Sequence, residues 1–100
     1  MLTLAFEVCA DPETHPDADV RAEIVRACRD AVGPDFAMMV DVQYRWYDAH
    51  SCLRTVNHWD DLDIYFLETP LQVDNLEGYA LLSREAPMRV ACGEWQNTRF

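Results

Sequence analysis

Three short apolar segments of this chain each end in an acidic residue, and these acids recur at nearly equal intervals. They are Asp41, Glu68 and Glu94, which stand 27 and 26 residues apart. An interval of this size accommodates one β-strand and one helix, and a strand followed by a crossover helix returns the next strand parallel to the first. The spacing therefore predicts an α/β fold in which equivalent strand ends lie side by side.

Carboxylates at neighbouring strand ends predict a bound cation. Adjacent strands lie roughly 4.8 Å apart, so acids at three consecutive carboxyl-terminal ends can converge on one point. Oxygen-only ligands select a hard cation such as Mg²⁺, held at about 2.1 Å with water or substrate completing the octahedron. We therefore expect Asp41, Glu68 and Glu94 to bind Mg²⁺.

Hydrophobic periodicity and turn residues divide the rest of the chain into strands and helices. We expect strands at residues 3–8, 36–41, 64–68 and 88–94 and helices at residues 17–32, 48–60 and 74–86. In the last strand, period 2 places Val90, Cys92 and Glu94 on one face. The predicted architecture is four parallel strands with three crossover helices, which is half of a TIM-type (β/α) barrel.

Spacings of three and four residues predict which helical side chains are buried. In the first helix this stripe contains Val20, Ile24, Ala27, Cys28 and Ala31. The charged residues of that helix are expected to face water: Arg21, Glu23, Arg26, Arg29 and Asp30. In the last helix a D-x-x-E sequence beginning at Asp74 predicts the helix start, and the side chains expected to pack inward are Leu76, Tyr79, Ala80 and Leu82.

Four stretches of the sequence together resemble a known family. They are residues 36–43, 64–70, 75–80 and 90–94, which read FAMMVDVQ, IYFLETP, NLEGYA and VACGE. In order and spacing they resemble the barrel domain of the enolase superfamily, in its mandelate racemase and muconate lactonizing branch. The likeness runs from about residue 4 to the end, so residues 1–100 resemble a partial barrel domain, strands two to five, without the capping domain.

The resemblance implies roles for individual residues. Asp41, Glu68 and Glu94 match the three Mg²⁺ ligands at the ends of the third, fourth and fifth barrel strands. Gln43 stands where the family often has Asn, and its amide is a candidate to reach the metal or a substrate. The family's Lys-x-Lys pair, whose second lysine serves as a base, matches Ala5 and Glu7 here, so the catalytic base stays unknown. Glu7 is equally well explained as a charge on an edge strand.

Composition limits the partners and the compartment. The net charge of −10 disfavours nucleic acid and anionic membrane surfaces. Apolar runs of at most five residues predict no spanning helix, and the N-terminus does not resemble a signal peptide, so we expect a cytoplasmic protein. Four cysteines without metal-like spacing are expected to be separate thiols.

Three functions are compatible with the sequence. The resemblance implies the Mg²⁺-binding half of an acid-sugar dehydratase or racemase, which removes a proton next to a carboxylate and stabilises the enediolate on the metal. The alternatives are a metal-binding module without catalysis and a truncated structural remnant. The chain contains no lysine, which favours the module when the chain stands alone. Half a barrel leaves two open sheet edges, so we also expect self-association or a complementing chain.

Overall fold

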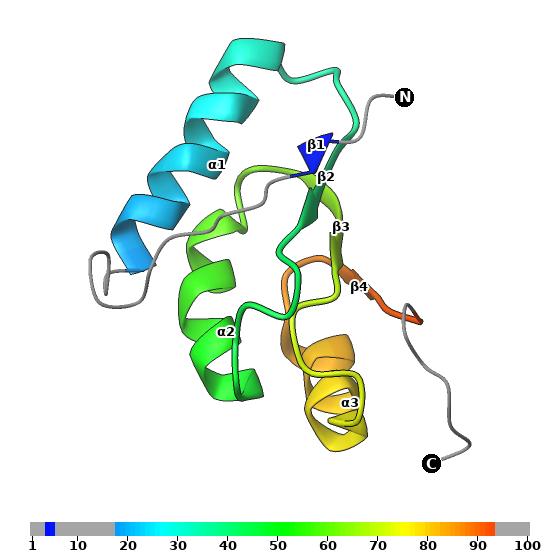
Figure 1. Cartoon of the computed structure of the whole chain (residues 1–100). Coiled ribbons are helices and arrows are strands. Elements are labelled where there is room, and N and C mark those ends of the chain that lie inside the picture. The colour runs from blue at the N-terminus through cyan, green and yellow to red at the C-terminus, as the bar shows by residue number, and fades with distance from the viewer. Residues whose placement is uncertain (1–3, 6–17, 94–100) are drawn as a thin grey trace.

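The computed structural model describes residues 4–5 and 18–93 of the chain. Within them, strands alternate with helices, and one short 3-10 helix continues the second α-helix (Figure 1). The elements are β1 (Leu4–Ala5), α1 (Ala18–Val32), β2 (Met38–Asp41), α2 (Ala49–Val56), η1 (Asn57–Trp59), β3 (Ile64–Glu68), α3 (Leu76–Glu85) and β4 (Arg89–Ala91).

The strands form one parallel sheet in the order β1-β2-β3-β4. Because β1 is only two residues long, the sheet consists mainly of β2, β3 and β4. Each of these follows a helix in the chain, as parallel strands require. The prediction of an α/β fold with parallel strands and helices is confirmed.

The helices and one face of the sheet enclose a single hydrophobic core. On the sheet, Val40 pairs with Leu67, which pairs with Val90, and the first two are fully buried. Each helix contributes at least one fully buried side chain to this core. These include Val25 in α1, Val56 in α2 and Leu82 in α3. The helix α2 contacts both α1 and α3 (Figure 1). The residues that follow these three on the strands therefore point to the opposite face.

The buried face of α1 differs from the predicted stripe. Val25 and Arg29 are buried, whereas Ile24 is 37% exposed and Ala27 and Ala31 are also exposed. The prediction that Arg29 faces water is wrong. The guanidinium of Arg29 donates to four main-chain carbonyls, described below, and these bonds hold this side of the helix against the loops that precede β2 and β3.

The start and inner face of α3 also differ from the prediction. The N-cap is Asn75, whose side chain accepts a hydrogen bond from the Gly78 N–H at 2.9 Å, so Asp74 is not the cap. Tyr79 and Leu82 are buried as expected, but Leu76 is 51% exposed and Ala80 is exposed too. Gly78 replaces them on the inner face, where a Cβ would lie 2.6 Å from a Leu71 methyl. The helix therefore approaches the loop after β3 very closely.

Candidate metal centre

Two of the predicted ligands lie side by side at the carboxyl-terminal end of the sheet. Asp41 is the last residue of β2 and Glu68 the last of β3. Their Cα atoms are partners in the strand register, so both side chains leave the same face of the sheet, the one opposite the helices. Both side chains are half-buried. Two adjacent carboxylates in this position repel one another unless a cation lies between them.

The third predicted ligand, Glu94, lies outside the described residues, as does Glu7. The described part of β4 nevertheless shows that Val90 is the partner of Leu67 and Ala91 the partner of Glu68. Ala91 therefore shares the face of Glu68, whereas Val90 lies on the face of Leu67. Because Glu94 is not among the described residues, the prediction that it shares a face with Val90 stays a prediction. Gly93 has φ +131, a backbone conformation that side chains rarely allow. The strand itself ends two residues earlier, at Ala91.

Left-handed backbone conformations follow both carboxylates, at the second and third residues after Asp41 and at the first residue after Glu68. Gln43 and Tyr44 after β2 have φ 46 and 58, and Thr69 after β3 has φ 53. Left-handed conformations cost free energy for residues other than glycine, most of all for a β-branched one. Thr69 also precedes Pro70, and residues before proline normally adopt an extended backbone. Costly conformations of this kind accumulate at functional sites.

Hydrogen bonds between the two loops hold this geometry. The N–H groups of Val42, Tyr44 and Trp46 donate to the carbonyls of Glu68, Thr69 and Pro70, at 3.2, 2.6 and 3.0 Å respectively. On its other side, the Thr69 N–H donates to the Ala91 carbonyl of β4 at 2.9 Å. The segment that carries Glu68 is thus fixed from both neighbouring strands, and its position relative to Asp41 is well determined.

The loop after Glu68 is also fastened to α3. The Tyr79 hydroxyl donates to the Leu71 carbonyl at 2.6 Å and accepts from the Leu71 N–H at 3.3 Å. Burial raises the pKa of Tyr79 to about 12, so this phenol is neutral at physiological pH. Tyr79 was predicted only as an inward-facing core residue, and nothing in the sequence indicates that its hydroxyl binds this loop.

Gln43 contributes to the site through its main chain. Its N–H donates to Oδ1 of Asp41 at 3.1 Å, which orients that carboxylate. The Gln43 side chain is exposed, and its predicted contact with a metal or substrate remains a prediction. Farther along this loop, Trp46 is buried, whereas Tyr47 is 88% exposed.

Thr69 is the residue of this region that sequence reasoning missed. Its side chain is 1% exposed, and its hydroxyl has no hydrogen-bond partner among the residues that the structure describes. A buried hydroxyl without a partner costs free energy. The sequence Thr-Pro indicates an extended segment, so neither the left-handed backbone nor the burial was predictable from it.

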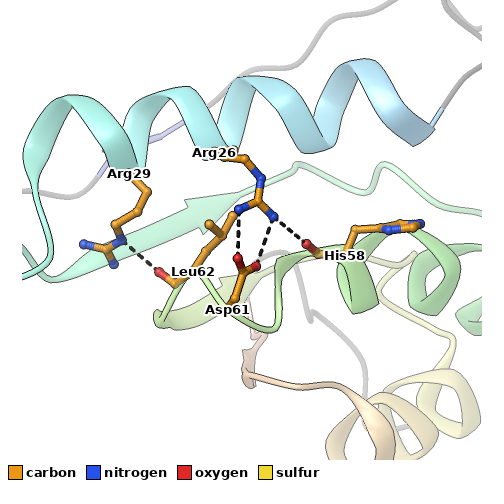
Figure 2. A network of polar contacts seen from close by, with 5 residues as sticks. All are labelled: Arg26, Arg29, His58, Asp61 and Leu62. Carbon is orange, nitrogen blue, oxygen red and sulfur yellow. Dashed lines mark hydrogen bonds and ion pairs between the residues drawn. The ribbon is translucent and has the colours of Figure 1, made fainter.

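The opposite end of the sheet is organised by arginine and not by carboxylates alone (Figure 2). Arg29 donates to the carbonyls of Leu62, Asp63, Gly33 and Phe36, at 2.6 to 3.0 Å. Arg26 makes a two-pronged ion pair with Asp61, at 2.8 and 3.0 Å, and also donates to the His58 carbonyl. A cavity of about 390 Å³ lies here, lined by Arg29, Asp30, Gly33, Pro34, Asp61, Leu62 and Asp63. It is at the far end of β3 from Glu68.

The donor set tests whether a cation fits. Within residues 4–5 and 18–93, no group of three or more His, Cys, Asp or Glu side chains comes together. The described site therefore consists of two carboxylates, Asp41 and Glu68. Carboxylate oxygens are the ligands of hard cations, so this pair fits Mg²⁺ as a partial coordination shell.

No helix among the described residues is long and apolar enough to cross a membrane.

Comparison with known proteins gives the family. Residues 5–100 match the model described as "Enolase C-terminal domain-like". The chain belongs to this family. The predicted resemblance to the enolase superfamily is thereby confirmed.

Several relatives within this enolase family are named as sugar-acid dehydratases. Over 68 residues the chain is 31% identical to the L-talarate/galactarate dehydratase of Salmonella typhimurium. The matched segment covers 68% of this chain and 17% of that enzyme. The solved structure of rhamnonate dehydratase from Gibberella zeae complexed with Mg is 33% identical, with a TM-score of 0.73, over 85% of this chain and 21% of that one.

A third relative was solved with both a metal and a ligand. L-talarate dehydratase from Polaromonas, complexed with Mg and L-glucarate, is 25% identical, with a TM-score of 0.75, over 93% of this chain and 24% of that one. The expectation of magnesium as the family's cofactor is confirmed by these solved relatives. The chain spans about a fifth of the length of the relatives that it matches.

Proposed function

We propose that this chain provides the magnesium-binding part of an enolase-superfamily enzyme that acts on acid sugars, as a dehydratase or racemase. The observation that carries the proposal is the register of Asp41 with Glu68, which brings two carboxylates together on one sheet face at strand ends. In (β/α) barrels the active site lies at the carboxyl-terminal ends of the strands. In this proposal residues 1–100 correspond to half of such a barrel.

Asp41, Glu68 and Glu94 would hold the metal in this proposal. Bound there, Mg²⁺ supplies a positive charge that binds a substrate carboxylate and offsets the negative charge developing when the neighbouring carbon loses a proton. The Gln43 N–H keeps the Asp41 carboxylate oriented, and the paired loops keep Glu68 beside it. The side chain of Gln43 is available for contact with a polar ligand.

A proton-abstracting base is not evident among the residues that the structure describes. The sequence contains no lysine, and His50 and His58 are exposed on α2 and η1, which belong to the helical layer and not to the carboxylate face. This observation favours a second candidate function, a metal-binding module that depends on other strands for catalysis. Such strands could come from a complementing chain or a second copy that pairs with an open edge of the sheet.

The test is a calorimetric titration of the 100-residue chain with Mg²⁺. We expect Asp41→Asn, Glu68→Gln and Glu94→Gln each to weaken binding by about 100-fold, since each removes a charged ligand. The matched control is Glu85→Gln, because Glu85 is an exposed acid and the last residue of α3. Binding of Mg²⁺ that survives both Asp41→Asn and Glu68→Gln would contradict the proposal.

A second measurement separates the enzyme from the module. The chain is incubated in deuterated water with saturating Mg²⁺ and galactarate, and the proton next to the carboxylate is followed by NMR. Exchange of this proton supports independent catalysis, because exchange requires a base in the chain. Binding of Mg²⁺ without exchange supports the metal-binding module.

A further inference from the structure

The Thr69 hydroxyl is the most anomalous polar group in the described site. It is fully buried, it is a β-branched residue in a left-handed conformation, and its hydroxyl has no partner among the described residues. Both features destabilise the folded chain. By contrast the main-chain N–H and carbonyl of Thr69 are both hydrogen-bonded, to Ala91 and Tyr44. The surroundings therefore force this residue into its conformation and leave only the hydroxyl unused.

The place of Thr69 in the chain relates its hydroxyl to the candidate ligand Glu68. Thr69 follows Glu68 directly, and the backbone of both residues is fixed by the loop after β2. The Glu68 side chain has three rotatable bonds, so its carboxylate can change position when a cation binds, whereas the backbone of Thr69 is held in place by its hydrogen bonds. Carboxylates that bind metals are usually held by hydrogen bonds from neighbouring groups, and loss of such a partner weakens metal binding.

We propose that Thr69 is a positioning residue for the cation site, whose hydroxyl donates a hydrogen bond to the Glu68 carboxylate in the cation-bound state. This inference rests on the proposed function. In the metal-free chain the buried hydroxyl destabilises the folded state, because it has no partner there. In the cation-bound chain its partner is the Glu68 carboxylate. Stability and metal affinity therefore depend on it with opposite signs.

The decisive variant is Thr69→Val, which keeps the shape and the backbone preference but removes the hydroxyl. We expect the dissociation constant for Mg²⁺, measured by calorimetry, to rise about tenfold or more. The melting temperature of the metal-free chain should be unchanged or higher, because a buried polar group without a partner is gone. Thr69→Ser retains the hydroxyl and is expected to bind Mg²⁺ like the wild type.

Thr55→Val is the matched control. Thr55 is also buried, at 3% exposure, but it lies in the last turn of α2, away from the loop that follows β2. We expect no change of Mg²⁺ affinity from this substitution. It therefore reports any effect that a Thr-to-Val change in the core has by itself.

The possible outcomes separate this inference from the proposed function. Wild-type chain that binds no Mg²⁺ overturns both. Wild-type binding together with equal binding by Thr69→Val overturns the role of Thr69 and leaves the metal site standing. A clear fall in the melting temperature of metal-free Thr69→Val also overturns it, because the hydroxyl would then have a structural partner.

Discussion

The two ends of the sheet differ in how their polar groups find partners. At the amino-terminal end, carbonyls of the loops converge on the buried guanidinium of Arg29, which satisfies four of them. At the carboxyl-terminal end, two carboxylates are brought together, left-handed residues follow them, and the Thr69 hydroxyl has no partner among the described residues. The bonds to the guanidinium lower the free energy of the folded chain, whereas the paired carboxylates and the Thr69 hydroxyl raise it. In (β/α) barrels this division is expected, because stability is concentrated at one end and chemistry at the other.

The comparison predicts its largest effect at Arg29. Arg29→Met keeps the length of the side chain but removes every donor, so buried carbonyls lose their hydrogen bonds. We expect the free energy of unfolding to fall by about 3 kcal/mol. This free energy is obtained from urea denaturation curves. Loss of Mg²⁺ affinity is not expected under conditions where the variant is folded, because Arg29 lies at the other end of the sheet.

Arg84→Met is the control for this substitution. Arg84 is exposed in the last turn of α3, and we expect its replacement to change stability by less than about 0.5 kcal/mol. If Arg29→Met were no more destabilising than Arg84→Met, the amino-terminal end would not be the stabilising one, and the contrast between the two ends would be wrong.

Arg29 also shows what the sequence could not predict. The apolar residues at helical spacing predicted α1, but the predicted stripe also included Ile24, Ala27 and Ala31, because an arginine is expected at the surface. Val25 and Arg29 are buried instead. The acceptors of Arg29 come from carbonyls at residues 33, 36, 62 and 63. Their convergence depends on tertiary structure and leaves no local pattern.

The strand ends were predictable for the opposite reason. Apolar runs with an acid at the end are local patterns, so the sequence predicted Ile64–Glu68 with the observed bounds and Asp41 as the last residue of its strand. Equal spacing then predicted that these two acids are neighbours. The face on which each β4 residue lies was not predictable in this way, because it depends on which residue pairs with Glu68, and that partner is Ala91.

The second largest effect is expected at Tyr79, which fastens the loop after Glu68. Tyr79→Phe removes one hydroxyl and leaves the Leu71 N–H and carbonyl without that partner. We expect a loss of about 2 kcal/mol, measured by urea denaturation. This result would show that stabilising contacts also support the carboxyl-terminal end. Tyr47→Phe, at an 88% exposed tyrosine, is the control and should have no effect.

The same variant gives a pH dependence. The pKa of Tyr79 is raised from 10.0 to about 12 chiefly by burial, so between these values the folded state keeps a proton that the unfolded state loses. The stability that this difference provides is complete below pH 10 and is lost as the pH rises toward 12, by about 1.4 kcal/mol per pH unit. Tyr79→Phe should lack this part of the decline. Parallel stability curves for the two proteins above pH 10 would contradict the burial of the phenol.

The smallest effect is expected at the ion pair of Arg26 with Asp61, although its two-pronged geometry resembles that of a strong interaction. Its side chains are 44% and 59% exposed, so water and salt compete with each charge. The hydrogen bond from Arg26 lowers the pKa of Asp61, and any stability that it provides is present at neutral pH and lost as the pH falls through that pKa. We expect Asp61→Asn, Arg26→Gln and the double variant to melt within replicate error of the wild type at pH 7. The three variants form a double-mutant cycle, which gives the coupling free energy between Arg26 and Asp61. If this coupling were as large as the stability lost in Arg29→Met, the network of Figure 2 would act as one unit. The buried guanidinium alone would then not account for the stability of this end.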